Sequence, residues 1–68
     1  MASLPSSTYL KALIAAIDGD ASVPVAIRNE CHRLMQAIDA NNALWISDSV
    51  DRIERLAKEA SLELPRRV

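Results

Sequence analysis

The chain has 68 residues, with eight basic and nine acidic side chains and a formal net charge of −1. A domain of this size buries only about 60% of the surface that its unfolded chain exposes, so regular helix packing or self-association is expected to stabilise it. Acidic and basic side chains alternate along the chain, which excludes the positive field that gathers DNA or RNA, and no nucleic-acid partner is expected.

Cysteine and histidine usage excludes two common ways of stabilising a small domain. Cys31 is the only cysteine and His32 the only histidine, so an internal disulfide and a Cys/His zinc site are both excluded. We expect no metal and no cofactor. The longest apolar run, residues 12–17, is far shorter than the ~20 residues of a membrane-spanning helix. With a lone cysteine that suits a reducing compartment, these features predict a cytoplasmic protein without membrane contact.

The first predicted helix spans residues 7–18. Ser6 or Ser7 can begin it by accepting a hydrogen bond from an exposed backbone amide. Its apolar residues repeat at the spacing of a single helix face, namely Leu10, Leu13, Ile14 and Ile17. Gly19 is expected to end the helix, because glycine adopts the left-handed cap conformation without a steric penalty.

The second predicted helix spans residues 23–40, with Ser22 as a cap and Pro24 near the first helical position. Its apolar stripe consists of Ile27, Cys31, Leu34, Met35 and Ile38. Asn41 and Asn42 favour helix caps and left-handed conformations, so the helix is expected to end near Ala40. A connection this short predicts an antiparallel helical hairpin with the next helix.

The third predicted helix spans residues 43–61. Its buried seam is expected to contain Ile46, Val50, Ile53, Ala57 and Ala60, widened by Leu56. On its outer face an acidic residue precedes a basic one by four positions, and each such pair stabilises a helix by about 0.2–0.5 kcal/mol. The three pairs are Asp48 with Arg52, Asp51 with Arg55, and Glu54 with Lys58. Residues 62–68 are expected to form a tail, because Pro65 cannot continue a helix.

These elements predict one all-α domain over residues 1–68, for which two arrangements are open. One is a monomeric three-helix bundle. The other is a homodimer, in which the helical hairpin pairs with a second copy to form a four-helix-type core with the first helix packed across it. Alanine-rich seams, which bury little area per residue, favour this dimer. In either arrangement the core or dimer seam is formed by Ile27, Cys31, Leu34, Ile38, Val50, Ile53 and Ala57.

Three consecutive apolar residues, Leu44, Trp45 and Ile46, cover three sides of the predicted third helix. A helix that is apolar on every side must be buried by more than its hairpin partner. The cover is either the first helix or another molecule, because tryptophan is enriched both in cores and at binding hot spots. We expect these residues, together with the other aromatic residue, Tyr9, to bind a partner protein.

Asp48-Ser49-Val50 resembles the Asp-Ser-Leu motif that opens a helix in acyl carrier proteins, where the serine receives a phosphopantetheine arm. The resemblance implies a carrier or accessory subunit that is modified on Ser49. Considered alone, the acids and serines suit the first turn of a helix.

Cys31 and His32 are neighbours in a helix and point about 100° apart, so they cannot share a proton, and no enzyme is predicted. The expected function is that of a small non-enzymatic protein-protein interaction module, such as a regulator, adaptor or inhibitor. The carrier role on Ser49 is the alternative, and a DNA-binding regulator is a third class, which the near-neutral charge disfavours.

Overall fold

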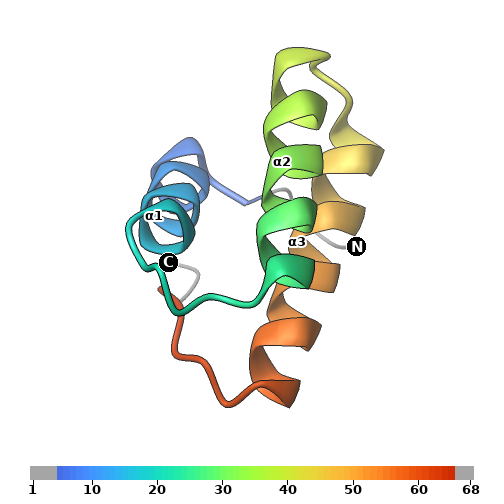
Figure 1. Ribbon diagram of the computed structural model, residues 1–68. Coiled ribbons are helices and arrows are strands. Elements are labelled where there is room, and N and C mark those ends of the chain that lie inside the picture. Colours follow the sequence, from blue (N-terminus) through green and yellow to red (C-terminus); the bar gives the residue numbers. More distant parts are fainter. Residues whose placement is uncertain (1–4, 66–68) are drawn as a thin grey trace.

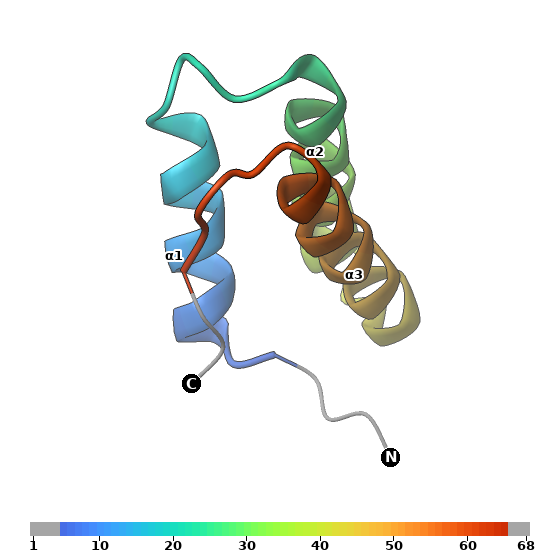
Figure 2. The ribbon, with the colours of Figure 1, turned by 90° about the horizontal axis from the view of Figure 1, so that it is seen from below.

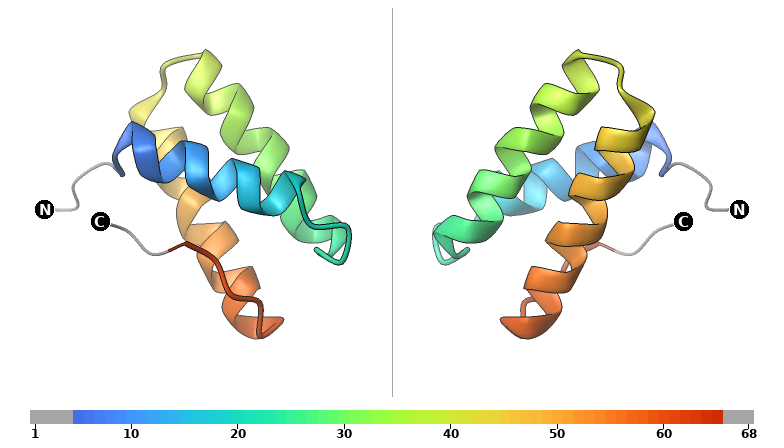
Figure 3. Two further views of the ribbon diagram at one scale, coloured as in Figure 1. Left: turned by 90° about the vertical axis from the view of Figure 1, so that its left-hand side faces the viewer. Right: turned by 90° about the vertical axis from the view of Figure 1, so that its right-hand side faces the viewer.

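The computed structural model describes residues 5–65, which form three helices and no strand. The helices are α1 (Ser7–Asp18), α2 (Val25–Asp39) and α3 (Ala43–Glu59). α2 and α3 lie side by side as an antiparallel hairpin, and α1 crosses one broad face of this hairpin (Figures 1 and 3). The predicted all-α hairpin with a shorter amino-terminal helix is confirmed. α2 begins two residues later than predicted, and α2 and α3 end slightly earlier.

Side-chain caps begin two of the three helices. The Ser6 hydroxyl accepts a hydrogen bond from the Tyr9 amide at 3.1 Å, and the Asn42 side chain accepts one from the Trp45 amide at 3.1 Å. Each bond satisfies an amide that has no partner within its helix. α2 instead begins at Pro24 without a side-chain cap, so the prediction that Ser22 caps this helix is wrong.

Ser22 instead orders the loop between α1 and α2. Its amide and its hydroxyl both donate to Asp20 Oδ1, at 2.9 and 2.6 Å, and these two bonds lower the pKa of the Asp20 carboxyl. Arg28 reaches back from α2 to donate to the carbonyl oxygens of Asp20 and Val23, at 2.5 and 3.3 Å. The loop is therefore tied both within itself and to the helix that follows it.

The ends of α2 and α3 share one geometry, in which a residue with positive φ follows the helix. Asn41 has φ 54° and Ser61 has φ 56°. At each end the next amide reaches back to a helical carbonyl, Asn42 to Ala37 at 3.0 Å and Leu62 to Ala57 at 2.8 Å. This is the Schellman arrangement, which satisfies carbonyl groups left over at a helix end.

Gly19 does not adopt the left-handed conformation that the sequence suggested. Its φ is −83° and its amide donates to the Ala15 carbonyl at 2.9 Å, so α1 ends in a right-handed turn. A Cβ atom at this position would lie 3.0 Å from the same carbonyl oxygen, which is tighter than ordinary packing. The glycine therefore relieves crowding at the end of α1 and does not supply a positive φ.

The hydrophobic core lies between α1 and the hairpin. Six of the seven residues predicted for the seam are buried in it, and α1 adds Tyr9, Leu10, Leu13 and Ile17. Ile38 is the exception at 36% exposed, and Ala37 is buried in its place. Ile38 is the second-last residue of α2 and so lies next to the closed end of the hairpin. Ala60, also predicted on the seam, is exposed because it follows the last turn of α3.

One copy of the chain therefore buries the hairpin seam by itself. α1 packs against α2, and its buried side chains share one core with those of α2 and α3. Within one chain the described residues form a three-helix bundle, and pairing of two such chains stays a prediction.

Residues 61–65, here called the C-terminal strap, run from the end of α3 across to α1 (Figure 2). Leu62 and Leu64 are half-buried and pack against the core. The predicted tail is non-helical over residues 62–65, and its two leucines give this segment apolar surface to bury. Residues 66–68 lie outside the described part of the chain.

Candidate functional site

Large exposed apolar side chains occur in the last turns of α2 and in the first turn of α3. Met35 and Ile38 lie in the last turns of α2, and Leu44 lies in the first turn of α3 with 85% of its surface exposed. Trp45 follows Leu44 and is half-buried. We call these four residues the hairpin-end surface. The remaining large exposed apolar residue of the described chain, Val25, lies at the opposite end of α2.

The four residues predicted to bind a partner do not form one surface. Leu44 is exposed, Trp45 is half-buried, and Ile46 is half-buried and packs against the core. Tyr9 is only 3% exposed and its hydroxyl donates to Glu54 Oε2 at 2.8 Å, so its assignment to a binding surface is wrong. Tyr9 precedes Leu13 by four residues, and this helical spacing was the signal for a core position.

Met35 and Ile38 join the surface although the sequence placed them in the apolar stripe of α2. The two residues are three apart and therefore neighbours on the helix. Their periodicity matched a core, yet Met35 is 48% and Ile38 36% exposed, and Met35 lines a depression together with Ile17 and Asp18 of α1. The spacing of apolar residues in the sequence does not predict the position at which another helix packs across α2.

Cys31 and His32 form no reactive pair. Cys31 is 3% exposed, whereas His32 is exposed to solvent. Burial raises the pKa of the Cys31 thiol, and the nearby Asp18 carboxylate raises it further, which opposes formation of the nucleophilic thiolate. A shallow depression beside the thiol is lined in part by Asp18, Arg28 and His32. Within residues 5–65, no group of three or more potential ligands is placed to hold a metal ion.

The raised pKa of Cys31 predicts a loss of stability at alkaline pH. The folded protein keeps the thiol proton after the unfolded chain has lost it, so this contribution is complete below the ordinary thiol pKa of 9.0. It is lost as pH rises through the folded pKa. Urea unfolding of the wild type and of Cys31→Ala from about pH 8 to about pH 10 should show the steeper decline in the wild type. Equal slopes would contradict the assignment.

Ser49 lies inside the protein, not on a free helix start. α3 begins at Ala43 with Asn42 as its cap, so Ser49 falls in the second turn and is 2% exposed. The interpretation of Ser49 as a first-turn residue is therefore wrong. A phosphopantetheine arm requires a serine that a modifying enzyme can reach, and this hydroxyl is enclosed in the folded chain.

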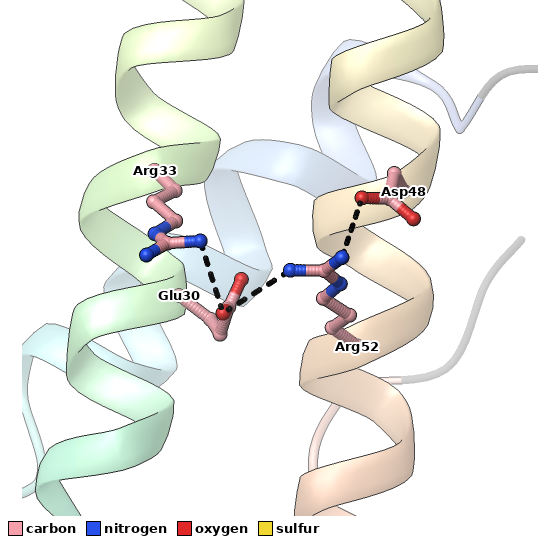
Figure 4. Close-up of polar contacts among 4 residues, drawn as sticks. All are labelled: Glu30, Arg33, Asp48 and Arg52. Atoms are coloured by element: carbon pink, nitrogen blue, oxygen red, sulfur yellow. Dashed lines mark ion pairs between the residues drawn. The ribbon is translucent and has the colours of Figure 1, made fainter.

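An ion-pair network joins α2 and α3 on the face of the hairpin turned away from α1 (Figure 4). Glu30 Oε1 lies 3.9 Å from both Arg33 and Arg52, and Arg52 lies 3.5 Å from Asp48. The predicted pair of Asp48 and Arg52 is thereby confirmed. Both arginines are about half exposed, so each pair contributes at most about 1 kcal/mol. Glu30 Oε2 is buried and accepts no hydrogen bond from the described residues, which reduces the net benefit further.

Among residues 5–65 no helix combines the length and the apolar character needed to cross a bilayer. Comparison of the whole chain with protein-family models, with curated proteins and with solved structures finds no match. The hairpin-end surface is therefore the feature from which a function is argued.

Proposed function

We propose that the protein is a non-enzymatic protein-protein interaction module that binds its partner through the hairpin-end surface. One observation carries this proposal. Three of the four large exposed apolar residues of the described chain lie at the closed end of the hairpin, including Leu44 at 85% exposure. Several large apolar side chains exposed in one region favour an interaction site, whereas single ones are common on any surface.

The residues around this surface suit an interface. Gln36, Asp39 and Asn41 are exposed beside the apolar side chains and provide polar groups at their border. An apolar centre with a polar rim is the usual composition of a protein interface. Complete burial of one leucine contributes roughly 1.5–3 kcal/mol, so Leu44 is the residue with most to gain from a partner. Trp45, half-buried at the same end, adds an aromatic side chain of the kind that anchors interfaces.

The partner that fits best is a protein with an apolar helix face or groove, as bound by a regulator, adaptor or inhibitor. A second copy of the chain is one form of such a partner, because a two-fold axis would pair the same apolar surface of both copies, with Leu44 of each able to meet Ile38 of the other. Sedimentation of the wild type over a range of concentrations separates self-association from binding of a different protein.

Replacement of Leu44 by aspartate is expected to abolish partner binding without unfolding the protein. Leu44→Asp removes apolar surface and places a charge in the interface, so recovery of the bound partner should fall at least ~10-fold. The matched control is Val25→Asp, because Val25 is 70% exposed but lies at the other end of α2. Affinity capture with quantitative mass spectrometry from the source cells should recover the same protein with wild type and Val25→Asp.

Circular dichroism should show the same helical content for both variants. The proposal fails if Leu44→Asp captures the same proteins as the wild type, or if Val25→Asp loses them equally. Trp45→Ala tests the adjoining residue: it should remain helical and lose the partner, whereas unfolding would place Trp45 in the core.

A further inference from the structure

The C-terminal strap has the pattern of an extended segment with one apolar face. Leu62 and Leu64 are half-buried against the core, whereas Glu63 between them is exposed. Alternate side chains of an extended chain point to opposite sides, so the two leucines share the side that faces the core. A Leu-x-Leu segment therefore lies on the body formed by the three helices.

The strap is attached to this body by few bonds. The amide of Leu62 donates to the Ala57 carbonyl at 2.8 Å, within the Schellman turn at the end of α3. Beyond Leu62, no backbone hydrogen bond joins residues 63–65 to the rest of the described chain. Ser61 holds a φ of 56°, which is unfavourable for a residue with a side chain. Burial of Leu62 and Leu64 is thus the main interaction that holds the strap in place.

The strap also closes a gap between helices. α1 and α3 do not approach within 8 Å between Cα atoms, whereas α2 packs against both. The strap crosses from α3 to α1 on the side where these two helices are apart (Figure 2). Its leucines pack against the core, so displacement of the strap would expose the apolar surface beneath them, here called the groove.

We propose that the strap is a displaceable intramolecular ligand, and that the groove beneath it binds an extended Leu-x-Leu segment of another protein. The strap itself shows which chemistry the groove accepts: two leucines two residues apart, joined by a residue that faces solvent. Displacement needs rotation at Ser61, which releases an unfavourable conformation, and it breaks no helix. This site is separate from the hairpin-end surface, and variants of Leu44 leave it unchanged.

The test uses a fluorescent peptide of residues 60–65, Ala-Ser-Leu-Glu-Leu-Pro, added to full-length protein and followed by anisotropy. Leu62→Ala/Leu64→Ala empties the groove of its own leucines, and Glu63→Ala is the matched control in the same segment. The double variant should bind the peptide at least ~10-fold more tightly than either the wild type or Glu63→Ala. A peptide with alanine in place of both leucines should not bind.

Four results would overturn the proposal. The first is equal affinity of the double variant and the wild type for the peptide, and the second is no peptide binding to the double variant. The third is equal binding of the peptide that has alanine in place of both leucines. The fourth is a wild-type dimer that the double variant does not form, which would assign the groove to the strap of a second copy. If the double variant loses its helical signal, Leu64→Ala alone takes its place. An unfolded Leu64→Ala protein would show that the strap is an indispensable part of the core and would equally refute its displacement.

Discussion

Leu34→Ala is expected to lower the free energy of unfolding by about 2–5 kcal/mol, which is the usual range for a fully buried leucine. Leu34 is 0% exposed and belongs to the core between α1 and the hairpin. A single core of this size rarely supplies more than about 3–5 kcal/mol, so most of the variant should be unfolded at 25 °C. Circular dichroism and urea titration measure the loss of helix and the change in stability.

Met35→Ala is the matched control for Leu34→Ala. The two residues are neighbours in α2 and of similar size, but Met35 is 48% exposed at the hairpin-end surface. Its replacement should lower the free energy of unfolding by less than ~1 kcal/mol, as is usual for surface positions. Similar losses for both variants would contradict the exposure of Met35, because they would require its side chain to be buried as well.

Tyr9→Phe is expected to lower the free energy of unfolding by about 1.5–3 kcal/mol, which is typical for a hydrogen bond to a charged group. The Tyr9 hydroxyl donates to Glu54 Oε2 at 2.8 Å, and the ring is 3% exposed. This bond joins the first turn of α1 to α3, two helices whose backbones are not in close contact. Phenylalanine keeps the packing of the ring and removes only the hydroxyl.

A double-mutant cycle with Glu54→Gln separates this hydrogen bond from other effects of each residue. If Tyr9 and Glu54 stabilise the protein by this mutual hydrogen bond, the decreases in the free energy of unfolding caused by the two single substitutions should not add. The coupling energy should then be roughly 0.5–3 kcal/mol. Additive losses would show that Tyr9 acts through its hydroxyl with some other group. Urea unfolding of the wild type, the two single variants and the double variant supplies all four stabilities.

Periodicity predicted the three helices and most of the core, because local spacing decides which side of a helix is apolar. Six of the seven seam residues are buried as expected. Ile38 and Tyr9 show the limit of this reasoning. Ile38 has the spacing of a core residue but is 36% exposed, and Tyr9 was assigned to the surface although its spacing from Leu13 fits the core. Crossing geometry depends on contacts between helices, which one sequence does not specify.

Helix ends were predicted unevenly, because several residues near each end compete for the same backbone groups. Asn41 adopts the left-handed conformation that its side chain tolerates, as expected. Ser22 could cap a helix by accepting a hydrogen bond, but its amide and hydroxyl instead donate to the Asp20 carboxylate, so it joins a turn. Ser61 takes a positive φ although neither glycine nor asparagine stands there, and burial of Leu62 after it explains why this conformation persists.

The candidate site was predicted in part. Leu44 is exposed, and Trp45 follows it at the closed end of the hairpin. The sequence predicted this because three consecutive apolar residues cover more sides of a helix than its hairpin partner can bury. Ile46 packs inward because it lies one turn before Val50 on the same face of α3. Met35 and Ile38 could not be assigned to this surface without the tertiary structure, since their exposure depends on the position of α1.

Amide hydrogen exchange of the protein with and without its captured partner tests most directly whether the hairpin-end surface is the binding site. Protection should increase in residues 35–47, which contain the end of α2, the connection and the first turn of α3. Residues 23–29, around the exposed Val25, should exchange equally in both samples. Unchanged exchange in residues 35–47, with protection elsewhere on the molecule, would contradict the proposed function.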